Sequence, residues 1–157
     1  MKFVLLTLKS AKPAWVKEGL EDYLRKIDPL QKIEMLEVTG STGASRENSE
    51  VKKKEDSKSL LAALKDDDYV VLFDERGQSL DSEGFAKKIN QFQMSGKKRI
   101  VFIIGGAYGV NDDVKSRAQT TISFSKLVMN HWVAQIVALE QIYRGFAILK
   151  GLPYHNV

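Results

Sequence analysis

The chain has 157 residues, 43% hydrophobic and 28% charged, proportions that are ordinary for a globular domain with a buried core. It contains no cysteine, which excludes disulfide frameworks, thiolate zinc sites and cysteine nucleophiles. Only two histidines are present, and we expect no metal centre. The formal charge of +4 is compatible with a nucleic-acid partner but does not require one.

The opening segment MKFVLLTLKS is apolar over too few residues to span a bilayer, and it lacks the small-residue cleavage site of a signal peptide. We therefore expect residues 2–8 to form the first strand of a cytoplasmic protein that has no membrane segment. A helix is predicted from Pro13 to Ile27, because proline favours a first helical turn and apolar residues recur at helical spacing. Residues 32–38 alternate as a half-buried strand does.

Residues 39–50 are polar and contain glycine and serine, which predicts a flexible loop. The charged run SRENSEVKKKEDSK, residues 45–58, leads into a helix whose apolar end includes Leu60, Leu61 and Leu64. Acidic residues nearly balance basic ones in this run. We therefore interpret it as a solvated helix face rather than as a nucleic-acid contact.

Residues 69–75 read as a buried strand, and the following RGQS, residues 76–79, reads as a turn. Ser82 is expected to cap the next helix. The apolar face of that helix consists of Phe85, Ile89 and Phe92.

The remaining elements are predicted in the same way. Residues 99–106 form a strand, and Asn111 caps a short helix. Residues 120–127 form the last strand, and the longest helix covers 131–150. The tail after it contains a proline and is expected to be extended or turned.

Strands and helices alternate along the whole chain, and the strands are uniformly apolar. This pattern predicts the α/β class, with a mostly parallel sheet covered by helices on both faces. There is no internal repeat and no sign of a second unit, so we assign residues 1–157 to one domain.

The strand at 99–106 ends in a glycine-rich turn. Gly105, Gly106 and Gly109 are spaced G-G-x-x-G, which departs from the dinucleotide fingerprint, and no Gly-Lys-Ser/Thr of a triphosphate loop follows. Two interpretations remain. The glycines serve a tight turn, in which Gly105 and Gly106 adopt backbone angles that other residues resist, or they let the backbone approach a ligand.

Three stretches together resemble the RlmH family of bacterial ribosomal large-subunit pseudouridine methyltransferases, which belongs to the SPOUT class. They are FIIGGAYGV (102–110), ISFSKLVMNH (122–131) and LEQIYRGFAILKGLPYHN (139–156), and the similarity extends over essentially the full chain. The resemblance implies a C-terminal trefoil knot, a homodimer and S-adenosylmethionine as cofactor. The implied reaction is methylation of N3 of a pseudouridine in 23S rRNA, with free rRNA, the large subunit or the ribosome as partner.

The resemblance places the cofactor at the carboxyl ends of the strands, where ligands of open α/β sheets bind. Glycines would let the main chain approach adenosine, and Phe73, Leu127 and Met129 would cover its faces. Core packing is the alternative for these three side chains. The implied cofactor residues are Phe73, Gly105, Gly106, Phe124, Ser125, Lys126, Leu127, Val128 and Met129.

Methylation of an imide nitrogen requires loss of its proton, so a base or anion-stabilising groups are needed beside it. The resemblance implies that Arg144, Tyr154 and His155 are catalytic, and that they contact the RNA together with His131. Arg144 has a structural alternative, an ion pair with Glu140 four residues earlier. The tail has the alternative of docking on a dimer partner. His131 begins a helix, so we expect a neutral imidazole, with a structural cap as the alternative.

Two residues depart from the family pattern. Asn130 stands where proline is common, and Gln135 stands where arginine is usual, which removes a contact to an anionic substrate. Two other functions therefore stay open. One is a SPOUT methyltransferase acting on tRNA or on another rRNA site, and the other is a non-catalytic RNA-binding or ribosome-assembly module.

Overall fold

The computed structural model describes residues 1–41 and 48–156. Its centre is a five-stranded sheet in the order β2-β1-β4-β3-β5, in which all neighbouring strands pair in parallel. The strands are β1 (Lys2–Leu8), β2 (Ile33–Val38), β3 (Tyr69–Ser79), β4 (Arg99–Ile104) and β5 (Thr120–Ser123). The helices are α1 (Ala14–Ile27), α2 (Ser49–Ala62), α3 (Ser82–Gln93), α4 (Asp112–Arg117) and α5 (His131–Leu149). The predicted α/β class is confirmed.

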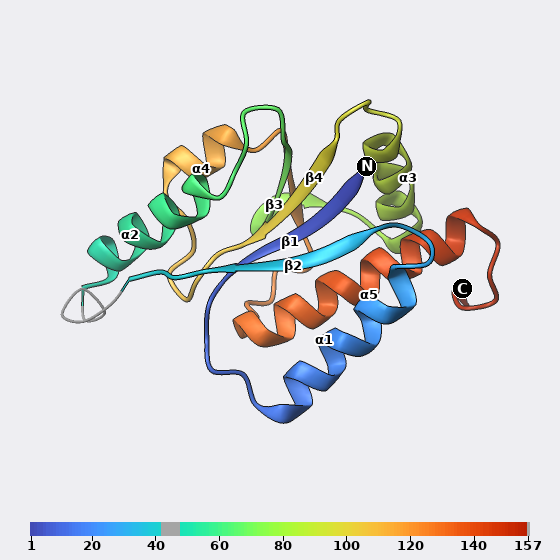
Figure 1. The fold of residues 1–157 in the computed structure, drawn as a ribbon, viewed down its shortest axis with the longest axis horizontal. Coiled ribbons are helices and arrows are strands. Elements are labelled where there is room, and N and C mark those ends of the chain that lie inside the picture. Colours follow the sequence, from blue (N-terminus) through green and yellow to red (C-terminus); the bar gives the residue numbers. More distant parts are fainter. Residues whose placement is uncertain (42–47, 157) are drawn as a thin grey trace.

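Helices cover both faces of the sheet (Figure 1). On β1, Phe3 and Leu5 pack toward α1, α3 and α5, whereas Val4 and Leu6 pack toward α2 and α4. All four side chains are fully buried. A strand that is buried on both faces needs apolar residues at every position, which explains the continuous apolar runs in the sequence.

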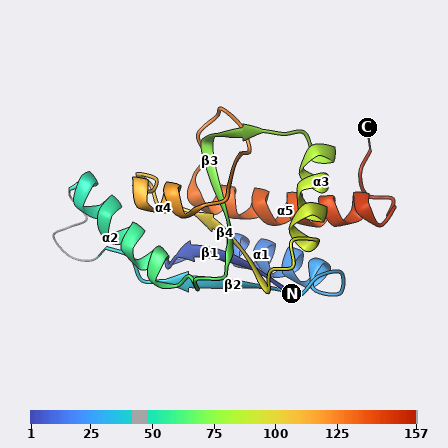
Figure 2. The same ribbon diagram turned by 90° about the horizontal axis from the view of Figure 1, so that it is seen from above.

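The helices α1 and α5 lie side by side and run in the same direction. Gly19 approaches Ile136, and further along both helices, by one turn on α1 and two turns on α5, Tyr23 approaches Tyr143. The first turns of the two helices therefore lie at the same end. The C-terminal tail lies at the opposite end of the molecule from α2 and α4 in both views (Figures 1 and 2).

The predicted turn at residues 76–79 is wrong, because β3 continues to Ser79. Both Phe73 and Gln78 pair with Ile122 of β5, so the strand contains a bulge between them. A Cβ at Gly77 would lie 2.7 Å from the backbone nitrogen of Ile122. The glycine that suggested a turn is therefore needed for the close approach of two strands.

Two predicted strand ends were too late. β4 ends at Ile104 instead of residue 106, and β5 ends at Ser123 instead of residue 127. Beyond β5 the hydroxyl of Ser123 donates to the carbonyl of Ser125 at 3.0 Å, and Ser125 Oγ accepts from the backbone N–H of Leu127 at 2.9 Å. These local bonds turn the chain away from the sheet.

The predicted cap at Ser82 is also wrong. Asp81 caps α3 by accepting from the Gly84 N–H at 2.7 Å, and the Ser82 hydroxyl instead donates to Gln141 at 2.8 Å. The cap at Asn111 is confirmed, since its side chain accepts from the Val114 N–H.

The predicted loop at 39–50 is shorter than expected. α2 already begins at Ser49, with Asn48 as its cap, and residues 42–47 lie outside the described part of the chain. Within the described residues, no helix is long and apolar enough to cross a membrane. The trefoil knot stays a prediction.

Asn130, the first departure from the family pattern, caps α5. Its Oδ1 accepts from the backbone N–H of Trp132 at 2.8 Å, which satisfies one of the free donors at the start of the helix. Proline at this position would leave that donor without the side-chain acceptor.

Replacement of Asn130 by alanine is therefore expected to lower the free energy of unfolding by about 1 kcal/mol, because the Trp132 N–H loses its acceptor. Asn130→Asp keeps an acceptor and should change the same quantity by less than about 0.5 kcal/mol. Chemical denaturation measures both. Equal losses in the two variants would contradict the capping role.

Candidate active site

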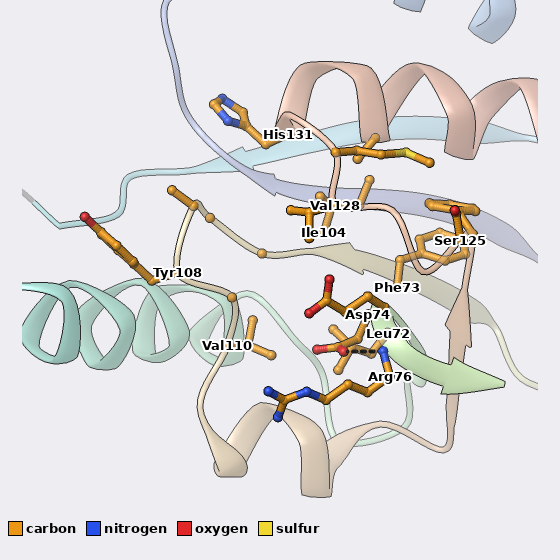
Figure 3. Close-up of a pocket in the computed structure, with 18 of the residues that line it drawn as sticks. Leu72, Phe73, Asp74, Arg76, Ile104, Tyr108, Val110, Ser125, Val128 and His131 are labelled. Atoms are coloured by element: carbon orange, nitrogen blue, oxygen red, sulfur yellow. Dashed lines mark hydrogen bonds between the residues drawn. The ribbon is translucent and has the colours of Figure 1, made fainter. Parts of the chain in front are cut away.

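A pocket of about 370 Å³ lies at the carboxyl end of β4 and beside the bulge of β3, where the pairing of these two strands ends, and it is within the size range of small-molecule sites. Figure 3 shows residues from both strand ends and from the segment after β5 around it. Its wall includes Leu72–Arg76, the glycine loop Ile104–Val110, most of the segment after β5, and His131 and Ala134 of α5. This is the sheet edge at which the sequence places the cofactor.

Phe73 and the segment after β5 form the apolar side of the pocket. The rings of Phe73 and Phe124 stack with their centroids 4.2 Å apart. The structure brings all of the expected cofactor residues to the pocket except Lys126, whose side chain does not line it. Leu127 and Val128 are 77% and 83% exposed, so this side is largely open in the single chain.

The glycine loop is a tight turn, but Gly105 and Gly106 do not have the unusual backbone angles considered in the sequence analysis. Only Gly109 of the three has a positive φ, +76°. Its N–H donates to the Gly106 carbonyl at 3.0 Å. A Cβ at Gly105 would lie 2.8 Å from Val110, and a Cβ at Gly106 would lie 3.0 Å from Asp56. Close packing therefore requires these two glycines.

Sequence reasoning missed the polar residues of the pocket. Asp74, Glu75 and Arg76 follow the buried part of β3 and line the opening, and Asp74 Oδ1 accepts from the Arg76 N–H at 2.9 Å (Figure 3). The signal was present, because polar residues directly after a buried parallel strand lie at the ligand-binding edge. Other lining residues outside the predicted set include Lys53, Tyr108, Val110 and Lys115.

His131 places an imidazole in the pocket wall. Burial, together with the positive charges of Lys12 and Lys52, lowers the pKa of its imidazole below the ordinary 6.5. The ring is therefore neutral at pH 7 and able to accept a hydrogen bond, as expected for a histidine at a helix start. Asn130 supplies the helix cap, so His131 does not have that structural role.

Arg144, Tyr154 and His155 form a second cluster, around Glu140. Arg144 Nη2 donates to the Glu140 carboxylate at 2.6 Å and its guanidinium lies 4.7 Å from the centre of the Tyr154 ring. Arg144 Nη1 is 3.1 Å from His155 Nδ1. Burial, and hydrogen bonds to Tyr23 and to Glu140, raise the pKa of the Tyr154 phenol above its usual range. The phenol therefore stays protonated and donates.

The structure does not bring this cluster to the pocket of the same chain. The pocket lies at the first turn of α5, whereas Arg144 lies 13 residues after His131, roughly 20 Å further along the helix axis. Gln135, between them, is 1% exposed. In this chain its side chain therefore has no access to RNA.

The described residues contain no group of three or more His, Asp or Glu side chains arranged to hold a metal ion.

Comparison with known proteins agrees with this geometry. Residues 1–155 match the family described as "Predicted SPOUT methyltransferase". The chain belongs to this family. A relative from Bdellovibrio bacteriovorus is 46% identical over 157 residues, which is 100% of both chains. Another from Enterococcus faecalis is 37% identical over 160 residues, covering 99% of this chain and 100% of the relative. Both are named "Ribosomal RNA large subunit methyltransferase H".

The pKa of His131 can be followed by NMR, because the chain has only two histidines and His155→Ala identifies the remaining imidazole signal. We expect a midpoint below 6.5 that rises when Lys12→Met removes one of the neighbouring charges. Since the unfolded chain takes up this proton at higher pH, the associated stability is present above pH 6.5 and is lost as the pH falls through the folded pKa. A midpoint above 6.5 would contradict the electrostatic environment described here.

Proposed function

We propose that residues 1–157 act as one methyltransferase domain that transfers a methyl group from S-adenosylmethionine to N3 of a pseudouridine in 23S rRNA. The observation that carries the proposal is the assembly of the glycine loop, Phe124, Ser125 and residues 127–129 into one pocket in a SPOUT chain. The names of the relatives support large-subunit rRNA as the substrate. The proposed location is the cytoplasm, on the large subunit or the assembled ribosome.

The pocket residues fit the cofactor. Gly105 and Gly106 leave backbone groups accessible in the wall, which suits recognition of an adenine edge by main-chain N–H and C=O groups. Phe73 and the apolar residues after Phe124 offer flat and flexible surfaces to its faces. When bound, the cofactor supplies an electrophilic methyl group on a sulfonium.

The chain's own residues then have to hold the acceptor in line and stabilise the imide after its proton leaves. In this proposal His131, neutral in the pocket wall, contacts the base through a hydrogen bond. Arg144 supplies a permanent positive charge, and the protonated Tyr154 supplies an O–H donor, both suited to an anion that develops on the imide. His155 accepts from Arg144 and orients the guanidinium.

These roles require a homodimer, because Arg144 lies 13 residues after His131 on α5, roughly 20 Å along the helix axis from the pocket of its own chain. Apolar side chains are exposed near the first turns of α1 and α5, where Trp15 is 56% and Val133 is 40% exposed. Together with Leu127 and Val128 they offer a surface for a second copy. In the proposed dimer the tail of one protomer completes the pocket of its partner.

The reaction is tested by incubating the protein with methyl-labelled S-adenosylmethionine and ribosomes that lack the modification. Label is expected in 23S rRNA, at a nucleotide whose mass and fragmentation identify N3-methylpseudouridine. Isolated tRNA serves as the alternative acceptor. Label in tRNA alone would show that tRNA, and not 23S rRNA, is the substrate. Cofactor binding without any methyl transfer would favour a non-catalytic module.

Sharing of the active site between protomers is tested by co-expressing two inactive variants. Gly106→Val disrupts the pocket, since its side chain would collide with Asp56 and Leu8, and Arg144→Ala with His155→Ala removes the tail cluster. Random pairing yields about half mixed dimers with one complete site each, so about one quarter of wild-type activity should return. Activity that stays absent in the mixture would show that each chain uses its own residues.

A further inference from the structure

Asp56 lies in α2, outside the pocket, and is only 2% exposed. Its Oδ1 accepts from the backbone N–H of Ser41 at 2.7 Å, and its Oδ2 accepts from Lys52 Nζ at 2.7 Å. It belongs to the charged run that the sequence suggests is a solvated face. The burial of one carboxylate within such a charged run therefore needs a structural explanation.

Two glycine backbones lie against this carboxylate. A Cβ at Gly40 would lie 2.3 Å from Asp56 Oδ1, and a Cβ at Gly106 would lie 3.0 Å from Asp56 Oδ2. Neither glycine has a positive φ, so the missing side chains serve close approach and not an unusual backbone angle. Because Gly106 lines the pocket, Asp56 supports the pocket wall from the side of α2.

The next residue of α2 contacts the other end of the same loop. Ser57 is fully buried, and its Oγ accepts from the backbone N–H of Asn111 at 2.9 Å. Asn111 directly follows Val110, the last lining residue of the glycine loop. Adjacent residues of one rigid helix therefore hold the loop near both of its ends.

Binding α2 to the sheet does not by itself require a charge. A buried ion pair loses much of its attraction to the cost of desolvation, and an apolar pair of similar size often stabilises a fold equally well. Unlike an apolar group, the carboxylate makes directional hydrogen bonds, which fix its orientation. Its two oxygens accept from Ser41 and Lys52, and in this orientation Oδ2 lies close to the backbone of Gly106.

We propose that Asp56 is a positioning residue, which holds the glycine loop through Gly106 in the conformation that binds S-adenosylmethionine. The inference rests on the proposed function, because it assigns the pocket to that cofactor. Asp56 does not touch the cofactor in this proposal and acts only through the loop.

The test is the affinity of the full-length protein for S-adenosylmethionine, measured by calorimetry. Asp56→Asn keeps the size of the side chain but replaces one acceptor oxygen with an N–H donor facing either Lys52 or Ser41, and it should weaken binding about tenfold. Circular dichroism at the same temperature verifies that the variant is folded.

Asp68 provides a matched control. It is also 2% exposed, is paired with Arg99 at 2.8 Å and accepts from the Lys65 N–H at 2.8 Å, but it precedes β3, at the sheet edge opposite the pocket. Asp68→Asn should therefore leave the affinity within about twofold of wild type, although it too disturbs a buried ion pair. A tenfold loss in both variants would assign the effect to general stability and overturn the proposal.

A second measurement tests the contact itself. Gly106→Ala should weaken binding in the wild-type background, because its Cβ meets Asp56 Oδ2 and Leu8 Cδ1, each at 3.0 Å. In the Asp56→Ser background the shorter side chain removes the first of these contacts, so the same substitution should have a smaller effect. Equal effects in both backgrounds would show that Asp56 does not act through Gly106.

The possible failures are distinguishable. Wild-type protein that does not bind the cofactor would overturn the proposed function, and this inference with it. Wild-type binding together with unchanged affinity of Asp56→Asn would overturn the positioning role alone.

Discussion

Burial of both faces of the central strands is the constraint on which the rest of the molecule depends. Phe3, Val4, Leu5 and Leu6 are all fully buried, so this part of β1 has no position for a functional polar group. The same holds for Val70–Leu72 of β3 and Ile100–Ile103 of β4. Because parallel strands end at one edge, polar and glycine residues gather there, after Phe73 and after Ile104. The location of the pocket follows from the packing of the sheet.

Much of the fold could be predicted from the sequence, because its signals are local. Apolar strands alternating with amphipathic helices are enough for a parallel α/β sheet, and Asn111 has the spacing of a helix cap. The pocket residues were predicted from the resemblance to the RlmH family and not from local signals. The structure brings them together but does not show their roles.

The incorrect predictions concern residue types that occur in two different structural environments. Gly77 indicated a turn, although here it allows two strands to approach closely. Asp56 looked like part of a solvated helix, because no sequence pattern shows that Gly40 and Gly106 will fold onto its carboxylate. Such contacts join segments far apart in the sequence. Periodicity and composition describe only neighbours along the chain, so they carry no information about these contacts.

The glutamate of the tail cluster changes the chemistry available to its neighbours. Glu140 accepts from both Arg144 and Tyr154, so it fixes the direction of the guanidinium. Burial, the hydrogen bond to Tyr23 and the hydrogen bond to Glu140 together raise the pKa of the phenol and keep it protonated. A cation held in this way presents its Nη1 donor at a defined angle, toward His155. Its attraction for RNA phosphates is correspondingly reduced by the adjacent carboxylate, which favours a local role over general binding of the nucleic-acid backbone.

The bulge in β3 has a consequence for how the chain tolerates changes in length. Phe73 and Gln78 both align with Ile122, so residues 74–77 of β3 have no partner in the register with β5. Beyond Phe73, β4 is no longer paired with β3 either. An inserted or deleted residue in this interval would be absorbed by the bulge without reversing the inward and outward positions on either side. The rim of the pocket can therefore change in length while Phe73 and Ile122 keep their places in the sheet.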